Sequence, residues 1–361
     1  MAIERILIVA PSWVGDAILS EPLVGLLRDP YEDPIVDILA PSWCAPVYAR
    51  MRGIRQIIET PFGHGKFDLA SRRTLARALR TGGYTRAFVL PNSWKSALVP
   101  YLARIPRRTG YRGEFRYGLL TDARKLDTKA MPRLVDRFAA LAASPGELVP
   151  LSPAPILVPD AINRAGAMRA LNLKTDRPVV ILCPGAEFGA AKRWPPNQFA
   201  DLAGLFLRDG LQVWIVGSPN DKISSEAVLM VMGETATKVR DLTGRTDLGT
   251  TIDILSSASL VVSNDSGLMH AAAAVGVPLV ALFGSSSPVY TPPLSPVARI
   301  AKIDIACSPC FKRECPLGHF KCMRELKPDM VYNLARSALP AYLPPSPTGK
   351  ITRKIGRELS G

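Results

Sequence analysis

Short apolar runs alternate with amphipathic stretches along the first third of the chain. The pattern predicts strands at residues 5–10, 35–39 and 86–90, and helices at 16–28, around 74–80 and at 95–103. Pro100 interrupts the last of these helices. Strands that are separated by helices indicate a parallel sheet with helices on both faces.

The same alternation restarts after a proline-rich segment. Residues 144–159 hold five prolines, a density that excludes regular elements and marks a linker. Beyond it we expect helices at 161–171, 195–209 and around 228–232, and strands at 179–183, 212–216, 260–263 and 278–283. The predicted fold class is therefore α/β, with two Rossmann-like, doubly wound parallel-sheet domains at 1–160 and 161–345. Residues 346–361 form a basic tail that we expect to be flexible.

Composition and charge narrow the choice of partner. The 361 residues carry 45 Lys and Arg against 31 Asp and Glu, a net charge of +14, which favours an anionic partner. Aromatic residues make up only 7%, and no nucleic-acid-binding module is recognisable, so we expect no nucleic-acid partner. The chain shows no signal peptide and no run of about 20 apolar residues, which predicts a cytoplasmic protein.

Two polar turns follow buried strands and precede helices. In the turn at 263–270, the first helical N–H groups point out beyond the end of the strand, where they suit an anion. His270 follows one turn into the helix. In the turn at 11–16, Asp16 lies at a helix start, where the dipole should hold its carboxylate ionised. That position suits a general base, and an ordinary N-cap aspartate is the alternative. The G-x-G-x-x-G fingerprint of dinucleotide sites is missing.

Further polar positions follow other predicted strands. Lys192, in the loop at 183–195, can reach phosphate oxygens at a neighbouring helix start, unless it is a solvated loop lysine. Gly217 and Ser218 end another strand, where a ribose could bind. A basic cluster suits carboxylates and phosphates, with a solvated basic face as the alternative; we select from it Lys95, Arg108, Arg112 and Arg116.

Four cysteines follow the spacing C-x2-C-x4-C-x6-C, with His319 among them: Cys307, Cys310, Cys315 and Cys322. This spacing is compatible with a structural zinc site. Reduced thiols that shape a loop are the alternative interpretation, and we expect no catalytic metal.

Taken together, six motifs resemble the ADP-heptose:lipopolysaccharide heptosyltransferases, over about residues 5–340. They lie in the family's order at 11–16, 90–97, 108–114, 183–189, 192–195 and 264–270. The resemblance implies a GT-B fold whose N-terminal domain binds the acceptor and whose C-terminal domain binds the nucleotide sugar. It also implies an inverting, metal-independent transfer of L-glycero-D-manno-heptose from ADP-heptose to the first heptose of the lipopolysaccharide inner core in a Gram-negative cell.

The resemblance also implies roles for individual residues. Asp16 matches the proposed catalytic base, and Lys192 matches the lysine on the donor phosphates. The remaining donor-binding positions are Asp265, Ser266, Gly267, Leu268 and His270, to which we add Glu187, Gly217 and Ser218. The implied acceptor is Kdo2-lipid A that carries one heptose, and no cofactor is required. We expect a monomer that makes peripheral contact with the anionic cytoplasmic face of the inner membrane.

Three alternatives stay open at this point. The chain could add the first heptose, or it could be another nucleotide-sugar transferase or an epimerase of the same architecture. A basic nucleic-acid-binding protein is the alternative from a different class. A panel of nucleotide-sugar donors separates the first two, and salt-sensitive binding of DNA or RNA identifies the third.

Overall fold

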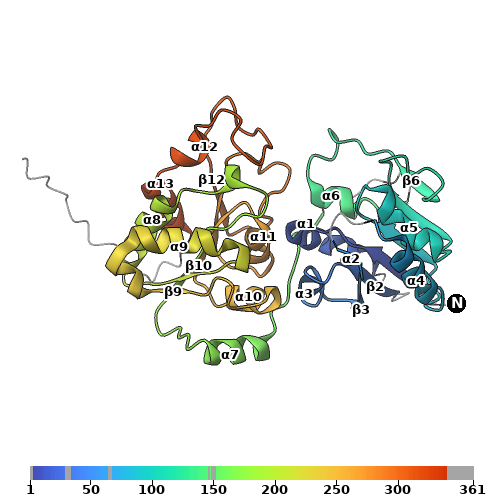
Figure 1. Ribbon diagram of the computed structural model, residues 1–361, viewed down its shortest axis with the longest axis horizontal. Helices are drawn as coiled ribbons and strands as arrows, with labels where there is room; N and C mark the ends of the chain where they lie inside the picture. The colour runs from blue at the N-terminus through green and yellow to red at the C-terminus, as the bar shows by residue number, and fades with distance from the viewer. Residues whose placement is uncertain (1–2, 29–33, 64–66, 145–146, 148–151, 340–361) are drawn as a thin grey trace, which may run out of the picture.

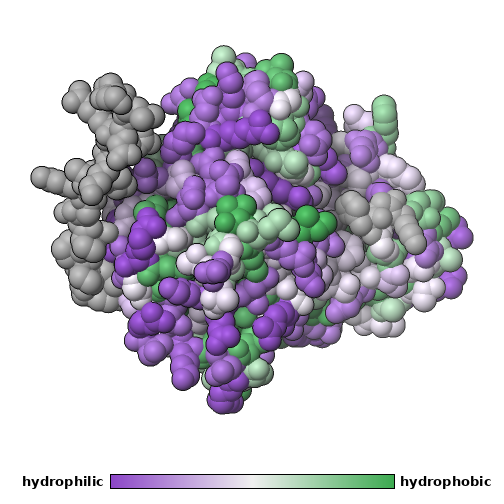
Figure 2. Space-filling view, turned by 60° about the vertical axis from the view of Figure 1, so that its left-hand side comes forward, coloured by the Kyte–Doolittle hydropathy of each residue, from purple (hydrophilic) through white to green (hydrophobic). Residues whose placement is uncertain are grey.

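The computed structural model describes residues 3–28, 34–63, 67–144, 147 and 152–339, so the basic tail at 346–361 lies outside the described residues. Within that part of the chain, no helix is both long enough and apolar enough to cross a membrane. Hydrophilic residues cover most of the face drawn in Figure 2, and its hydrophobic patches are small and separate.

The first half forms one parallel sheet of six strands in the order β3-β2-β1-β4-β5-β6 (Figure 1). Its strands are β1 (Arg5–Val9), β2 (Ile35–Ala40), β3 (Ile54–Glu59), β4 (Arg86–Val89), β5 (Arg107–Tyr111) and β6 (Asp122–Arg124). Its helices are α1 (Val14–Leu19), α2 (Glu21–Leu27), α3 (Ala45–Tyr48), α4 (Leu69–Arg80), α5 (Trp94–Leu102) and α6 (Leu134–Ala139).

The second half forms another parallel sheet of six strands, in the order β12-β11-β10-β7-β8-β9. Its strands are β7 (Val179–Cys183), β8 (Gln212–Ile215), β9 (Val239–Asp241), β10 (Leu260–Asn264), β11 (Leu279–Leu282) and β12 (Ala298–Ala301). Its α-helices are α7 (Ala161–Ala170), α8 (Pro196–Arg208), α9 (Lys222–Met232), α10 (Leu248–Leu255), α11 (Gly267–Ala274), α12 (Lys321–Arg324) and α13 (Pro328–Ala338), and its 3-10 helices are η1 (Ala190–Lys192), η2 (Pro219–Asp221) and η3 (Gly233–Lys238).

The predicted fold class is confirmed. Numbered within its own half, each sheet has the strand order 3-2-1-4-5-6 of a Rossmann fold. In such sheets the order reverses between the first and fourth strands, and ligands bind beyond the carboxyl ends of the strands at that point. Here the reversal lies between β1 and β4 in the first sheet and between β7 and β10 in the second.

The structure corrects several expected elements. The helix predicted at 16–28 is two helices, α1 and α2, because Pro22 lacks an N–H and clashes with the carbonyl four residues earlier. The sequence pattern also misses five α-helices, α3, α6, α10, α12 and α13, and five strands. Four of these strands, β3, β6, β9 and β12, carry polar residues because they lie at or near a sheet edge, and β5 begins with two arginines.

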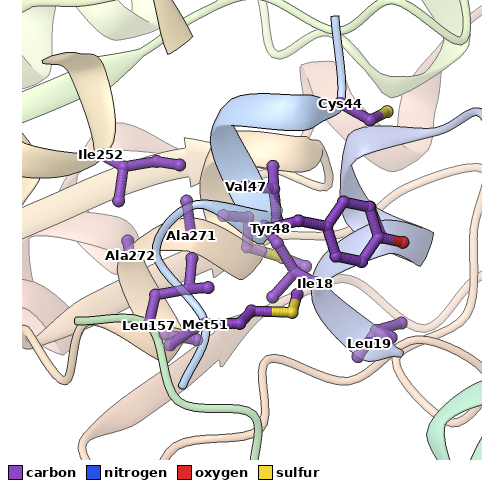
Figure 3. Packing of buried hydrophobic residues seen from close by; sticks show 14 of the residues in the cluster. Ile18, Leu19, Cys44, Val47, Tyr48, Met51, Leu157, Ile252, Ala271 and Ala272 are labelled. Atoms are coloured by element: carbon purple, nitrogen blue, oxygen red, sulfur yellow. The ribbon is translucent and has the colours of Figure 1, made fainter. Parts of the chain in front are cut away.

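One buried hydrophobic cluster runs from the first half into the second. Figure 3 shows Ile18 of α1 and Val47, Tyr48 and Met51 of α3 and the turn after it facing Ile252 of α10 and Ala271 of α11. The short alanine side chains of α11 let the helices of the other half approach closely. Because the contact is apolar and continuous, burial of hydrophobic surface holds the two halves together.

The predicted linker lies against the contact between the two halves. Of the linker, the structure describes residues 144, 147 and 152–159. There the Leu157 N–H donates to the Ala274 carbonyl and the Val158 N–H donates to the Arg50 carbonyl, at 3.0 and 2.8 Å. Leu157 itself is 2% exposed. The linker therefore bonds to both halves, and its prolines shape an extended strap that has no helix or strand of its own.

A buried carboxylate connects the same elements. Both Asp253 oxygens accept from the Arg50 guanidinium, at 2.7 and 2.6 Å, and the Asp160 N–H and the Asn163 amide also donate to Asp253. Burial alone would raise the pKa of Asp253, but these hydrogen bonds hold it below its usual value. Asp253 is therefore ionised. Its hydrogen bonds connect α10 to Arg50, in the turn after α3, and to the residues that follow the linker.

We expect Asp253→Ala to lower the free energy of unfolding by about 3–5 kcal/mol, because it leaves the mostly buried Arg50 guanidinium without a counter-ion. Urea denaturation followed by circular dichroism measures the change. The exposed pair Lys302–Asp304 provides the control, and Asp304→Ala should shift stability by less than about 1 kcal/mol. Equal effects of the two variants would contradict a structural role for Asp253.

Candidate active site

Three strand ends bring the principal predicted residues together. Asp16 follows β1, Lys192 follows β7, and Asp265 follows β10. These are strands at which the sheet order reverses, so topology places all three residues where such sheets bind ligands. Asp16 lies in α1, and Asp265 lies just before α11. Figure 1 shows α1 and α11 side by side between the two sheets.

The first turns of α1 and α11 touch because each has a glycine at the contact. A Cβ on Gly267 would lie 2.8 Å from Val14 Cβ, and a Cβ on Gly15 would lie 2.9 Å from Cδ2 of His270. Neither position has room for a side chain. The backbones of the two halves therefore approach closely at this point, and Asp16 of one half lies beside the turn at 264–270 of the other.

Asp16 is the third residue of α1, inside the helix rather than at its cap. A pKa of about 6 keeps Asp16 ionised near pH 7, as expected, but the helix start does not hold its pKa low. Burial among protein atoms raises the pKa of Asp16 to about 6, Lys192 lowers it, and Asp265 raises it. Since no hydrogen bond to its carboxylate is seen among the described residues, desolvation outweighs the helix dipole.

Lys192 is not a solvated loop lysine. Its Nζ lies 2.6 Å from Oδ2 of Asp265, and both side chains are largely buried. The lysine side chain also lies near the Phe188 ring, with Nζ 5.0 Å from the ring centroid. Trp194 anchors the loop, since it is buried and its indole N–H donates to the Leu326 carbonyl at 2.8 Å. The Lys192 ammonium is therefore held in place with its charge balanced by Asp265.

The backbone N–H groups at the N-terminus of α11 are not capped by a side chain. Ser266 is the N-cap, but its side chain makes no capping hydrogen bond, and Gly267 and Leu268 are the first helical residues. His270 is buried, and this burial lowers its pKa to about 4, so the imidazole is neutral near pH 7. A neutral imidazole brings no positive charge to the donor phosphates, and the His270 ring lies against Gly15.

The other predicted donor residues lie at the ends of β7 and β8. The Asn220 amide donates to Glu187 at 2.8 Å, which links the two loops. The Ser218 hydroxyl donates to Asp221, so an internal partner already occupies its proton, and Gly217 is buried against the same aspartate. In the next loop, no hydrogen-bond partner for the buried hydroxyl of Thr243 is found among the described residues.

The predicted acceptor residues behave differently from one another. Lys95 lies in the first turn of α5, and Arg112 is exposed beyond β5. Arg108 is half-buried and donates to the carbonyls of Leu119 and Ile105. Arg116 is only 2% exposed, and its guanidinium donates to the carbonyls of Tyr111 and Pro91. The structure therefore does not place Arg116 where an acceptor could reach it.

Sequence reasoning missed two residues of the site. The Asn264 side chain is fully buried, accepts from the Trp194 N–H and donates to the Pro184 carbonyl, so it joins the Lys192 loop to β10. Tyr290 lies close enough to Asp16 for the carboxylate to help raise its pKa, after burial, and Arg137 stacks 4.9 Å from its ring centroid. The polar turn after β10 was a signal for Asn264, whereas Tyr290 comes close only through the fold.

All six cysteines are free thiols. Cys307, Cys310, Cys315 and Cys322 line one cavity of about 20 Å³ together with His319. Across the described residues, no three His, Cys, Asp or Glu side chains are gathered as metal ligands. The structural zinc and the lack of a catalytic metal both stay predictions.

The electrostatics of Asp16 can be tested directly. We expect its carboxyl to titrate near pH 6, at a higher pH in Lys192→Ala and at a lower pH in Asp265→Asn, because these variants remove the lowering and raising charges. Carbon-13 NMR of labelled aspartate measures all three values, with Asp16→Asn identifying the resonance. Identical values in the three proteins would show that the two halves do not meet at this point in solution.

The chain is similar to known proteins over most of its length. Residues 72–321 match the model of glycosyltransferase family 9 (heptosyltransferase). Lipopolysaccharide heptosyltransferase 2 of Salmonella typhimurium is 41% identical over 93% of this chain and 98% of its own length. The solved Escherichia coli ADP-heptose lipopolysaccharide heptosyltransferase II superposes with a TM-score of 0.82 at 38% identity, over 92% of this chain and 98% of that one. A structure of E. coli heptosyltransferase WaaC with ADP-2-deoxy-2-fluoro heptose shares the fold, with a TM-score of 0.68, 20% identity, and 92% and 99% coverage. The chain belongs to glycosyltransferase family 9, the heptosyltransferases.

Proposed function

We propose that this protein transfers L-glycero-D-manno-heptose from ADP-heptose to the first heptose of the lipopolysaccharide inner core, with inversion at the anomeric carbon. One observation carries the proposal: the contact of α1 with α11 puts a carboxylate of one half beside the anion-binding turn of the other. The 41% identity to a heptosyltransferase 2 over nearly the full length supports the choice of heptose and acceptor.

Asp16 acts as the general base. Its pKa of about 6 leaves it ionised near pH 7, yet makes it a stronger base than an ordinary aspartate. The acceptor hydroxyl donates a hydrogen bond to the carboxylate and then transfers its proton as its oxygen attacks the anomeric carbon. The bond from that carbon to the diphosphate oxygen breaks on the opposite side, which inverts the configuration.

The second half stabilises the leaving diphosphate. A lysine ammonium has three N–H donors, and Asp265 accepts one of those of Lys192, so two remain for phosphate oxygens. The uncapped N–H groups at the start of α11 add donors with the positive end of the helix dipole behind them. Asp265 is therefore a positioning residue that aims Lys192 rather than a contact to the diphosphate.

The acceptor binds at the carboxyl edge of the first sheet. The segment after each of five parallel strands exposes an aromatic side chain: Trp13, Trp43, Phe67, Trp94 and Phe115. The cationic Lys95 and Arg112 follow two of the same strands, β4 and β5. The rings of Phe67 and Trp94 lie 5.1 Å apart, which joins two of these segments. Aromatic faces suit sugar rings and acyl chains, and the cations suit carboxylates and phosphates. This combination fits Kdo2-lipid A that carries one heptose.

The two parts of the chain divide the work. Residues 1–160 bind the acceptor and 161–345 bind ADP-heptose, with no cofactor taking part. The exposed aromatic and basic residues of the first sheet meet the anionic face of the inner membrane, and the protein acts as a monomer. A structural zinc at the four cysteines stays a prediction, separate from the reaction.

The two key residues should fail in different ways. We expect Asp16→Asn to lower kcat by about 10²–10⁴-fold with little change in the KM for ADP-heptose, because only proton removal is lost. Lys192→Ala should raise that KM. In the wild type, kcat should fall as the pH drops through about 6, since protonated Asp16 cannot accept a proton. Steady-state kinetics measure all three, with Asp304→Asn as the control, and full turnover by Asp16→Asn would eliminate the base assignment.

The acceptor can be identified by incubating the protein with ADP-heptose and Kdo2-lipid A that carries zero or one heptose. Mass spectrometry should detect addition to the acceptor with one heptose and at least tenfold slower addition to the acceptor with none. ADP-mannose and UDP-glucose serve as control donors. Preference for the acceptor without heptose would mean that the chain adds the first heptose instead.

A further inference from the structure

The loop at 307–322 lies across the donor side of the site. Two hydrogen bonds tie it to the end of β11: the Phe311 N–H donates to the Ser285 carbonyl, and the Ser308 hydroxyl donates to the Gly284 carbonyl, at 2.6 and 2.7 Å. Its far end is buried through Cys322 and Met323 in the core of the second half. The loop is therefore fixed to the same sheet edge that presents Lys192 and α11.

The middle of this loop docks on the Lys192 segment. The Ala191 N–H donates to the Arg313 carbonyl at 2.9 Å. A Cβ on Gly189 would lie 2.4 Å from the same carbonyl oxygen, so no side chain fits between the two backbones. The contacts of the Arg313 carbonyl with residues 189 and 191 therefore fix where Arg313 lies in space, close to Lys192.

Two cations converge on one aromatic ring at this junction. The Phe188 ring centroid lies 5.0 Å from Lys192 Nζ and 5.4 Å from the Arg313 guanidinium carbon. The charge of Lys192 is balanced by Asp265, whereas no ion pair to Arg313 is seen in the part of the chain that the structure describes. Arg313 is also exposed, and its guanidinium carries five N–H donors.

We propose that Arg313 is a second donor-binding cation, which binds the diphosphate of the nucleotide sugar together with Lys192. This inference rests on the proposed function. Like charges repel, and the attraction of each for a phenyl face is small at an exposed site, so an anion is what completes the arrangement. The planar guanidinium can bind two phosphate oxygens at once, whereas the Lys192 ammonium binds as a point charge.

The loop then has a function in donor binding, besides any function of its cysteines. It brings the arginine to the diphosphate, and both cations contact the same aromatic ring, that of Phe188. Lys312 is a neighbouring basic residue, exposed on the same loop. Within the described residues, no cation–π contact of Lys312 with the Phe188 ring is seen. Lys312 is therefore the matched control for Arg313.

Calorimetric titration of the full chain with ADP, and with adenosine as the probe without phosphate, tests the proposal. We expect Arg313→Gln to weaken ADP binding about tenfold and to leave adenosine binding and thermal stability unchanged. Arg313→Lys, which keeps the charge and loses the fork, should fall between the wild type and Arg313→Gln, and Lys312→Gln should bind ADP as the wild type does.

The outcomes separate this inference from the proposed function. If Lys192→Ala loses ADP affinity while Arg313→Gln keeps it, the role of Arg313 is overturned and the proposed function stands. If Arg313→Gln weakens ADP and adenosine equally, Arg313 shapes the loop and the proposal is also overturned. A wild-type protein that binds neither ADP nor ADP-heptose overturns both.

Discussion

The close approach of α1 to α11 is the constraint on which the candidate site depends. Gly15 and Gly267 leave no side chain between the two first turns, and the hydrophobic cluster around Ile18 and Ala271 holds the helices there. A side chain at either glycine would force the halves apart and move Asp16 away from Lys192. The reacting groups thus depend on packing between halves whose strands lie far apart in the sequence.

That contact also sets the electrostatics. Asp16, Lys192 and Asp265 place two carboxylates and one ammonium in a partly buried space, where Lys192 lowers and Asp265 raises the pKa of Asp16. Burial raises the pKa of Asp16 toward neutrality, which suits a base, while Asp265 fixes and balances Lys192. His270 stays neutral because it is enclosed between the same helices. Under the proposed function, a diphosphate bound here would meet directed donors, a lysine whose charge is balanced by Asp265, and Arg313, for which no ion pair is seen among the described residues.

The sequence predicted the local features of this site well. Asp16, Lys192 and Asp265 follow buried strands whose apolar runs are plain, and parallel strands put all such residues at one edge of a sheet. It predicted poorly where burial decides. Arg116 reads as one more surface arginine in a basic cluster, yet its donors bind backbone carbonyls inside the protein. The strands β3 and β6 escaped notice because edge strands do not need apolar residues on both faces.

The sequence alone determined the α/β class, the repeat of one sheet type in both halves, the turns that carry the candidate chemistry and the family resemblance. These depend on periodicity, turn residues and local motifs, which neighbouring residues fix. The tertiary structure decided that Asp16 faces the turn of the other half, that its pKa is raised, that Asp265 pairs with Lys192, and that Arg313 shares a ring with that lysine. Burial and ion pairing join residues from separate parts of the chain, so only the packed structure fixes them.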